Sequence, residues 1–242
     1  MKKLLRSLLD RYFDSFARKS DIDSFARKSD IENLYTQLAA LMDVREIVGS
    51  GVRLGPLRNW ALSPDALAII LAEIQSRESP TVLEFGAGES TVAIAAALER
   101  KGVGSLVTIE HNPEYRQKIF RRLTQSRTEH LVDLRLVDMQ VHEPRLGFPA
   151  FTSYDLSTLD IDFDIAVIDG PPVTHPSDAT RLGPLDWCIS HVTEWGSIYI
   201  DDAERPIDRV VIEAARRANP QVEAEVLDTE KGLVRLSIRR PQ

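Results

Sequence analysis

The sequence lacks the features that mark disulfide-rich, membrane-spanning or nucleic-acid-binding proteins. Among its 242 residues is one cysteine, Cys188, so neither an internal disulfide nor a cysteine metal site can form, which fits a reducing compartment. No apolar run approaches the roughly 18 residues that cross a bilayer, and no signal-peptide cleavage site follows the basic start. The formal charge of −7 argues against a nucleic-acid backbone as the main partner. We expect a cytoplasmic protein without a transmembrane segment.

Length and composition instead favour one α/β domain with an extension. Hydrophobic residues at 43% and charged residues at 28% are ordinary values for a globular chain. The length allows one full domain and is short for two. We predict an N-terminal helical extension over residues 1–47 and the main domain over residues 48–242.

The N-terminal extension contains a tandem repeat. Residues 14–22 and 23–31 are the same nonapeptide, Asp-Ser-Phe-Ala-Arg-Lys-Ser-Asp-Ile. Nine residues are two and a half helical turns, so a continuous helix places Phe16 and Phe25 on opposite faces. Two copies also fall short of the three that stacked repeats need. We interpret the repeat as a duplicated stretch of a long helix or helix pair.

Residues 1–31 are also basic, unlike the rest of the chain. They hold eight Lys or Arg against five Asp, a net charge of +3 that leaves −10 on the remainder. Combined with the leucines of residues 4–9, this allows a helix that docks on a partner subunit or one that lies on an anionic membrane surface. We favour a homo-oligomer formed through the N-terminal helices, with peripheral membrane contact and a solvated terminus as alternatives.

From residue 63 onward, strand and helix patterns alternate. The predicted strands are 82–85, 105–110, 132–137, 163–169 and 197–201, and the predicted helices are 66–76, 90–100, 113–127, 177–191 and 205–218. This alternation indicates a parallel sheet covered on both faces. Two final strands, 222–227 and 233–238, form a hairpin. We predict a doubly wound, mostly parallel seven-stranded sheet with a C-terminal antiparallel hairpin, in which the weakly patterned residues 139–162 are a lid or a helix.

The ends of the first three strands carry the residues of a nucleoside-binding crevice. Gly86 and Gly88 let the backbone turn tightly and approach a ligand, beside the unpaired N–H groups of the following helix. Glu110 ends the second strand, where it can accept hydrogen bonds from ribose hydroxyls. Asp138, after the third strand, could reach an adenine amino group. Thr91 stands where a dinucleotide fingerprint has its third glycine, which counts against a nicotinamide cofactor.

Three more carboxylates end the next two strands. Asp169 follows one strand, and Asp201 with Asp202 follow its expected neighbour. Carboxylate oxygens in this arrangement suit Mg²⁺, and like charges so close would raise one another's pKa without a cation. Alternatively, Asp202 caps the helix that starts near Arg205. Arg181 and Arg205 could bind an anionic acceptor or form structural salt bridges.

Four segments in this order resemble the class I S-adenosylmethionine (SAM)-dependent methyltransferases: Val-Leu-Glu-Phe-Gly-Ala-Gly from residue 82, Val-Thr-Ile-Glu-His-Asn-Pro from 107, Asp-Ile-Ala-Val-Ile-Asp-Gly from 164 and Tyr-Ile-Asp-Asp from 199. The resemblance covers about residues 60–240 and is strongest to the catechol O-methyltransferase-like and bacterial sugar O-methyltransferase groups. It implies a Rossmann-like methyltransferase fold over residues 48–242, with SAM as cofactor.

The resemblance also implies site residues. In addition to Asp138, the cofactor would be lined by Glu84, near the methionine moiety, and by Gly86, Gly88, Ser90, Glu110 and Asp169. In the metal-dependent members, the magnesium positions match Asp169, Asp201 and Asp202.

The chain departs from the catechol-type pattern at the general base. Those enzymes carry a lysine three residues after the first metal aspartate, where this chain has Pro172. His175 lies nearby and could accept a hydroxyl proton. We therefore take Asp169, His175 and Asp201 as the candidate catalytic residues.

The function predicted from these residues is O-methylation of a small hydroxylated acceptor, such as a sugar or glycan unit, with magnesium assistance. Two alternatives stay open: a non-catalytic binding or assembly protein on a methyltransferase fold, with the N-terminal helices as its working part, and an NAD-dependent dehydrogenase that uses the same crevice.

Overall fold

We describe residues 28–238 of a computed structural model of the chain, so all but the last four residues of the nonapeptide repeat lie outside the described part. The helices are α3 (Lys28–Val48), α4 (Pro64–Ser76), α5 (Glu89–Lys101), α6 (Pro113–Ser126), α7 (Leu182–His191) and α8 (Pro206–Ala218), with a 3₁₀ turn at Glu129–Leu131. The strands are β1 (Thr81–Phe85), β2 (Ser105–Glu110), β3 (Val132–Leu136), β4 (Met139–His142), β5 (Phe151–Tyr154), β6 (Phe163–Ile168), β7 (Val192–Ile200), β8 (Val222–Leu227) and β9 (Leu233–Ile238).

Seven strands form one sheet, in the order β3-β2-β1-β6-β7-β9-β8. The first five are parallel, and β9 runs antiparallel to both β7 and β8. The strand order reverses between β1 and β6, which is where doubly wound sheets bind ligands. The predicted fold class is therefore confirmed, including the C-terminal hairpin.

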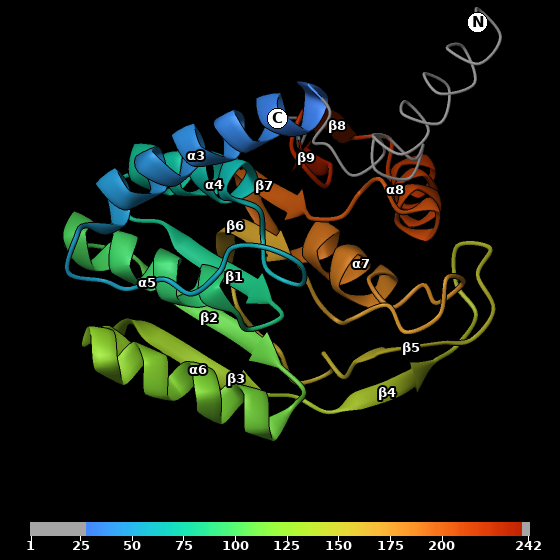
Figure 1. Ribbon diagram of the computed structural model, residues 1–242. Helices are drawn as coiled ribbons and strands as arrows, with labels where there is room; N and C mark the ends of the chain where they lie inside the picture. The colour runs from blue at the N-terminus through green and yellow to red at the C-terminus, as the bar shows by residue number, and fades with distance from the viewer. Residues whose placement is uncertain (1–27, 239–242) are drawn as a thin grey trace, which may run out of the picture.

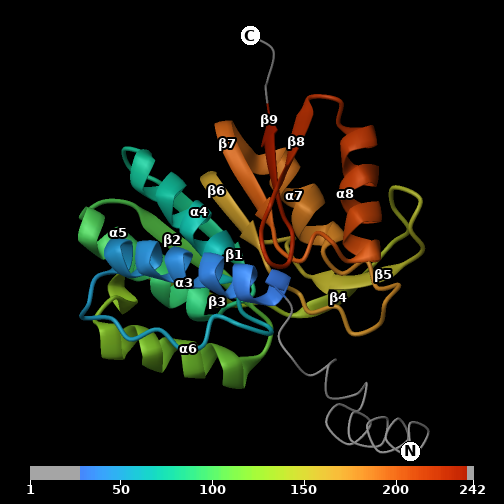
Figure 2. The same cartoon turned by 45° about the horizontal axis from the view of Figure 1, so that its top comes forward.

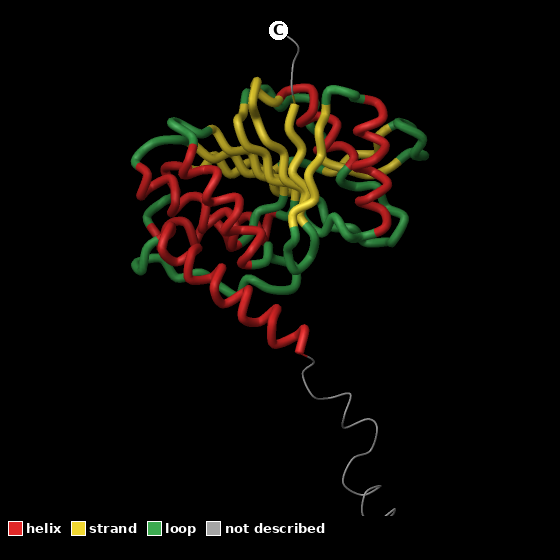
Figure 3. The backbone as a smooth tube through the Cα atoms, turned by 90° about the horizontal axis from the view of Figure 1, so that it is seen from above, coloured by secondary structure: helices red, strands yellow, loops and turns green. Residues whose placement is uncertain are grey.

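Helices cover both faces of the sheet because side chains along each strand alternate between two apolar clusters (Figures 1 and 3). Val82 and Ile165 pack with α4, α5 and α6 on one face. Leu83 and Ala166 pack with α7 and α8 on the other. Such two-sided burial is typical of parallel strands. It leaves the carboxyl ends of the strands as the open edge of the sheet.

Helix α3 lies across α4 and α5 (Figure 2). It continues to Val48, and Val44 and Val48 are buried in the core. Its opposite side exposes an apolar stripe made of Ile31, Leu34, Tyr35, Leu38 and Met42. No helix in the described part of the chain is long and apolar enough to cross a bilayer.

The connection between β3 and β6 differs from the prediction. Residues 139–162 contain an antiparallel two-stranded ribbon, β4 paired with β5, so the helix interpretation is wrong. The strands are four residues each, too short to give a periodic pattern. The ribbon packs against α7, and Ser153 donates a hydrogen bond to the carbonyl of Thr180, just before that helix, at 2.6 Å. It closes one side of the crevice.

Helix α7 also starts later than predicted, at Leu182 instead of residue 177. The loop before α7 contains a turn held by a side chain. In this turn Asp178 accepts hydrogen bonds from the Thr174 hydroxyl and the His175 N–H, each at 2.8 Å. Side-chain bonds of this kind compete with helix formation. The delayed start places Arg181 at the helix N-cap, with its side chain buried.

Candidate active site

The turn after β1 requires a glycine at its first position. Gly86 has φ +95°, and a Cβ there would lie 2.8 Å from the Gly170 nitrogen, in the loop after β6. Gly88 differs, since its φ of −166° is open to any residue and a Cβ would meet the Ser90 hydroxyl oxygen at an ordinary 3.5 Å. Only Gly86 is needed for the turn itself. Gly88 keeps the N-terminus of α5 uncovered by a side chain.

Glu84 lies in β1 beneath this turn and has no exposed surface. Its carboxyl group accepts hydrogen bonds from the hydroxyls of Ser90, Thr91 and Thr108 at 2.5, 2.6 and 2.9 Å. Burial raises the pKa of Glu84 to about 7, although the three hydroxyls oppose the shift. Glu84 therefore ties the start of α5 to the sheet. Its predicted contact with the methionine moiety stays a prediction, as does that of the buried Ser90.

Thr91 explains why the dinucleotide fingerprint is absent. Its hydroxyl donates to Glu84 and accepts the Gly88 N–H at 2.8 Å. The residue at the position of a third glycine thus fastens the turn instead of leaving room for close packing. The sequence showed the missing glycine, but the hydroxyl's two bonds become visible only in the structure.

Glu110 lies at the end of β2, across from the glycine turn. Its carboxylate accepts the backbone N–H groups of His111 and Asn112 at 2.8 and 2.7 Å, and that of Ala87 at 3.2 Å. The last bond links it to the Gly86–Gly88 turn. The structure thus brings together the acidic residue and the turn that the sequence placed in one crevice.

A cavity of about 460 Å³ opens beside Glu110. Its walls come from His111, from the β4–β5 ribbon and from the loop between β6 and α7. Asp138 precedes the ribbon and is exposed, and its carbonyl accepts the Asp155 N–H at 2.8 Å. A reach to adenine stays a prediction for Asp138.

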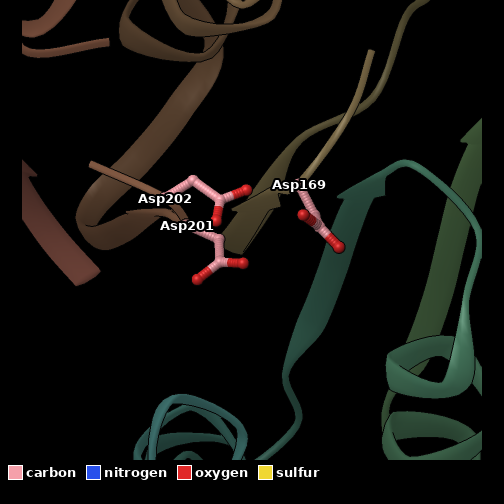
Figure 4. A group of neighbouring side chains, drawn as sticks. All are labelled: Asp169, Asp201 and Asp202. Atoms are coloured by element: carbon pink, nitrogen blue, oxygen red, sulfur yellow. The ribbon is translucent and has the colours of Figure 1, made fainter. Parts of the chain in front are cut away.

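On the other side of the crevice, Asp169, Asp201 and Asp202 converge after β6 and β7, as predicted (Figure 4). One oxygen of each lies within 4.8 Å of the others. Burial, and then the charge of Asp201, raise the pKa of Asp169 to about 7. Burial also raises the pKa of Asp201. This group of three residues is called the carboxylate trio below.

Cationic side chains surround the carboxylate trio. Lys231, from the turn between β8 and β9, places its Nζ 2.6 Å from Asp201 Oδ2 and 3.4 Å from Asp202 Oδ1. Arg181 is buried and lies 3.6 Å from Asp169 and 3.3 Å from Asp202. Burial acts to lower the pKa of Lys231, but the nearby carboxylates, with Asp201 first among them, together outweigh burial and raise that pKa. No sequence pattern indicated Lys231, which lies in an ordinary turn.

The two arginines form salt bridges, which was one of the two interpretations. Arg205 lies 2.7 Å from Asp202, and Arg181 also pairs with Asp208 of α8 at 3.7 Å. Asp202 is therefore an ion-pair partner of Arg205, and its side chain accepts no capping hydrogen bond from α8. With both guanidiniums directed at carboxylates of the chain, recognition of an anionic acceptor has no support in these contacts.

His175 lies on the exposed part of the loop before α7. Its Nδ1 is 2.8 Å from the Ser177 hydroxyl. Among the described contacts, none joins His175 to Asp169, Asp201 or Asp202. Its role as general base stays a prediction, and the carboxylates of the trio are better placed.

The carboxylate trio has the ligand type that magnesium prefers. The trio is close enough to share one ion, and Asp201 Oδ1 is buried without a hydrogen-bond partner among the described residues. However, the ammonium of Lys231 already bridges Asp201 and Asp202. An ion would have to displace this ammonium. The arrangement therefore does not fit a divalent cation, and the chemistry proposed for this site uses none.

The doubly wound sheet and the crevice at the carboxyl ends of its strands are typical of nucleotide-binding folds, among them that of the methyltransferases. The sequence profile of a methyltransferase-domain family matches residues 83–203. That match covers half of the chain, and the chain belongs to this family. The resemblance to class I SAM-dependent methyltransferases is thus confirmed. A comparison with curated proteins gave no significant match.

Solved structures of methyltransferases share this fold. The S-adenosylhomocysteine (SAH)-bound methyltransferase PaMTH1 of Podospora anserina superposes with a TM-score of 0.55 at 13% identity, over 99% of this chain and 97% of that chain. The SAM complex of the O-methyltransferase TomG from Streptomyces achromogenes gives 0.53 at 17% identity, over 96% of each chain. A putative caffeoyl-CoA O-methyltransferase from Staphylococcus aureus gives 0.57 at 14%, over 85% of this chain and all of that chain. At these identities the likeness is one of fold.

Proposed function

We propose that this protein is a SAM-dependent O-methyltransferase that acts on a small hydroxylated acceptor, such as a sugar or glycan unit. The observation that carries the proposal is the arrangement of the crevice. Glu110 and the Gly86 turn lie on one side of the strand-order reversal, and the carboxylate trio lies on the other. The first side suits a nucleoside and the second suits an acceptor that must lose a proton.

On the cofactor side, we assign the ribose hydroxyls to Glu110 and the base to the cavity beside His111. The backbone from Gly86 to Gly88 would face the amino acid part of the cofactor, since no side chain covers it. Glu84, Ser90 and Thr91 hold that backbone in place. When bound, SAM supplies an electrophilic methyl group on its sulfonium.

On the acceptor side, we assign proton uptake to Asp169. A carboxyl group with a pKa of about 7 is divided between its two protonation states near neutral pH, which suits general base catalysis. The acceptor hydroxyl would transfer its proton to Asp169 as its oxygen takes the methyl group. Asp201 acts on the same site through its charge. Most acceleration would come from positioning the acceptor oxygen in line with the sulfonium.

Magnesium assistance belongs to the prediction from the sequence, and the contacts of Lys231 count against it.

Self-association also stays part of the proposal, with the exposed apolar stripe of α3 as its surface. Light scattering of the whole chain and of a variant with Leu34 and Leu38 changed to Ser would test it. Equal masses would contradict it. We also propose a cytoplasmic location, because a single cysteine fits a reducing compartment.

The test of the proposed function is SAH binding measured by calorimetry. Glu110→Gln replaces an acceptor oxygen by an NH₂ donor at similar size. We expect SAH affinity to fall about tenfold to a hundredfold, since a hydrogen bond to a charged group is worth about 1.5–3 kcal/mol. Gln125→Glu on the outer side of α6 is a control for surface charge. If the wild-type protein does not bind SAH, the proposal fails.

A non-catalytic role on the same fold is the second candidate, favoured by the apolar stripe of α3. Methyl transfer to any acceptor in a screen with labelled SAM would exclude it. Family membership and the bonds of Thr91 count against the dehydrogenase alternative.

A further inference from the structure

Lys231 brings an ammonium group to the carboxylate trio. This ammonium donates a hydrogen bond to Asp201, whose side chain has no exposed surface, and 18% of the Lys231 side chain remains exposed. It also forms an ion pair with Asp202 at 3.4 Å. Among the described residues, the bond to Asp201 is the one hydrogen bond found for this ammonium.

The turn that carries Lys231 is fixed on both sides. Gly232 follows with φ +75°, and its carbonyl accepts the Ala203 N–H at 3.0 Å, next to the trio. A Cβ on Gly232 would overlap Glu204. The preceding Glu230 donates its N–H to Asp65 of α4 at 2.8 Å. Lys231 is therefore held over the carboxylates by its backbone, unlike a surface lysine that swings in solvent.

The charges around the site are already close to balanced. Four carboxylates lie there with three cations: Asp169, Asp201, Asp202 and Asp208 with Arg181, Arg205 and Lys231. Like charges this close need a cation to remain ionised. A divalent ion would supply two more positive charges and would repel the ammonium that bridges Asp201 and Asp202.

We propose that the ammonium of Lys231 is the built-in cation of this site and takes the place that a divalent ion would have between Asp201 and Asp202. The site is then metal-independent. If the proposed function holds, the Lys231 ammonium orients the acceptor oxygen while Asp169 receives its proton. The methyl group moves from sulfur to oxygen, and sulfur keeps the electron pair of the broken bond. Lys231 itself is a positioning residue.

The test is binding of Mn²⁺ to the full-length chain, followed by electron paramagnetic resonance. Mn²⁺ prefers the same oxygen ligands as Mg²⁺. We expect the wild-type protein to bind none at the trio, and Lys231→Met to gain one site with an affinity at least about tenfold above background. That site should disappear in the K231M/D201N double variant. Lys101 provides the matched control, because its ammonium binds the Gln75 carbonyl at 2.9 Å and lies away from the trio. The variant Lys101→Met should gain no Mn²⁺ site.

Each other result overturns the inference. Saturable binding of one Mn²⁺ by the wild type, lost in Asp201→Asn, would show that the ion displaces Lys231. No binding by folded K231M would show that Lys231 does not hold an ion's place. If K231M does not fold, the double variant K231M/D201N, which removes one charge of each sign, tests the ion pair instead. Recovery of its thermal transition supports the pairing of Lys231 with Asp201, and failure to recover contradicts it. SAH calorimetry on the same samples tests the proposed function separately, because the Mn²⁺ result does not depend on it.

Discussion

The two sides of the crevice bury carboxylates in opposite ways. At the ends of β1 and β2, Glu84 and Glu110 are satisfied by hydroxyls and backbone N–H groups, which are neutral donors. At the ends of β6 and β7, Asp169 and Asp201 face Arg181 and Lys231. We call these the β1–β2 end and the β6–β7 end. Neutral donors hold the glycine turn without a network of charges, whereas removal of one partner of a buried ion pair leaves a buried charge unpaired.

The largest effect is expected at the β6–β7 end. Arg181→Met removes a guanidinium that is 2% exposed and faces Asp169, Asp202 and Asp208. Removal of one partner of a buried ion pair costs about 3–5 kcal/mol, because the carboxylates left behind are uncompensated. Urea denaturation measures the change in the free energy of unfolding.

Arg205 provides the matched control, because its side chain is 35% exposed and pairs with the same Asp202. The control variant is Arg205→Met. We expect it to cost no more than about 1 kcal/mol. Equal losses in the two variants would remove the distinction between a buried network and a surface pair.

The second prediction concerns pH at the β1–β2 end. The pKa of Glu84 is raised to about 7 from 4.5, so the native state holds a proton that the unfolded state releases between these values. Stability therefore falls as pH rises from about 4.5 to about 7, and levels off above. The integrated effect is at most about 3 kcal/mol.

Glu84→Gln keeps the shape of a neutral carboxyl group and removes this titration. Chemical denaturation at pH 5 and pH 8 should show a smaller difference for the variant than for the wild type. An unchanged pH dependence would mean that the three hydroxyls hold Glu84 ionised in the native state, and would contradict the raised pKa.

The third prediction compares the two glycines of the β1–β2 turn. Gly86→Ala forces a side chain into positive φ and against the Gly170 nitrogen, so we expect a loss of about 1–3 kcal/mol in stability. Gly88→Ala has an extended backbone and ordinary contacts. It should change stability by less than about 0.5 kcal/mol and weaken only SAH binding. Similar melting temperatures for both variants would contradict the assignment.

The order of elements could be predicted because it depends on local patterns. The strands, the glycine turn and the meeting of Asp169 with the Asp201–Asp202 pair follow from parallel strands that end on one edge. Lys231 could not be predicted, since its position depends on β9 pairing with β7, a contact that periodicity does not encode. Burial of Arg181 was missed because the loop before α7 read as helix. The β4–β5 ribbon was missed because its strands are short.

The pairing of β9 has a consequence for synthesis of the chain. Residues 233–238 lie between β7 and β8 in the sheet, although they follow both in the sequence. While the chain emerges from the ribosome, β7 is therefore an open sheet edge until these residues arrive, and open edges invite pairing with other chains. Ribosome-bound chains halted before residue 231 should lack both the neighbour of β7 and the ammonium of the site. The β6–β7 end of the crevice is therefore completed only after the residues of β9 have been made.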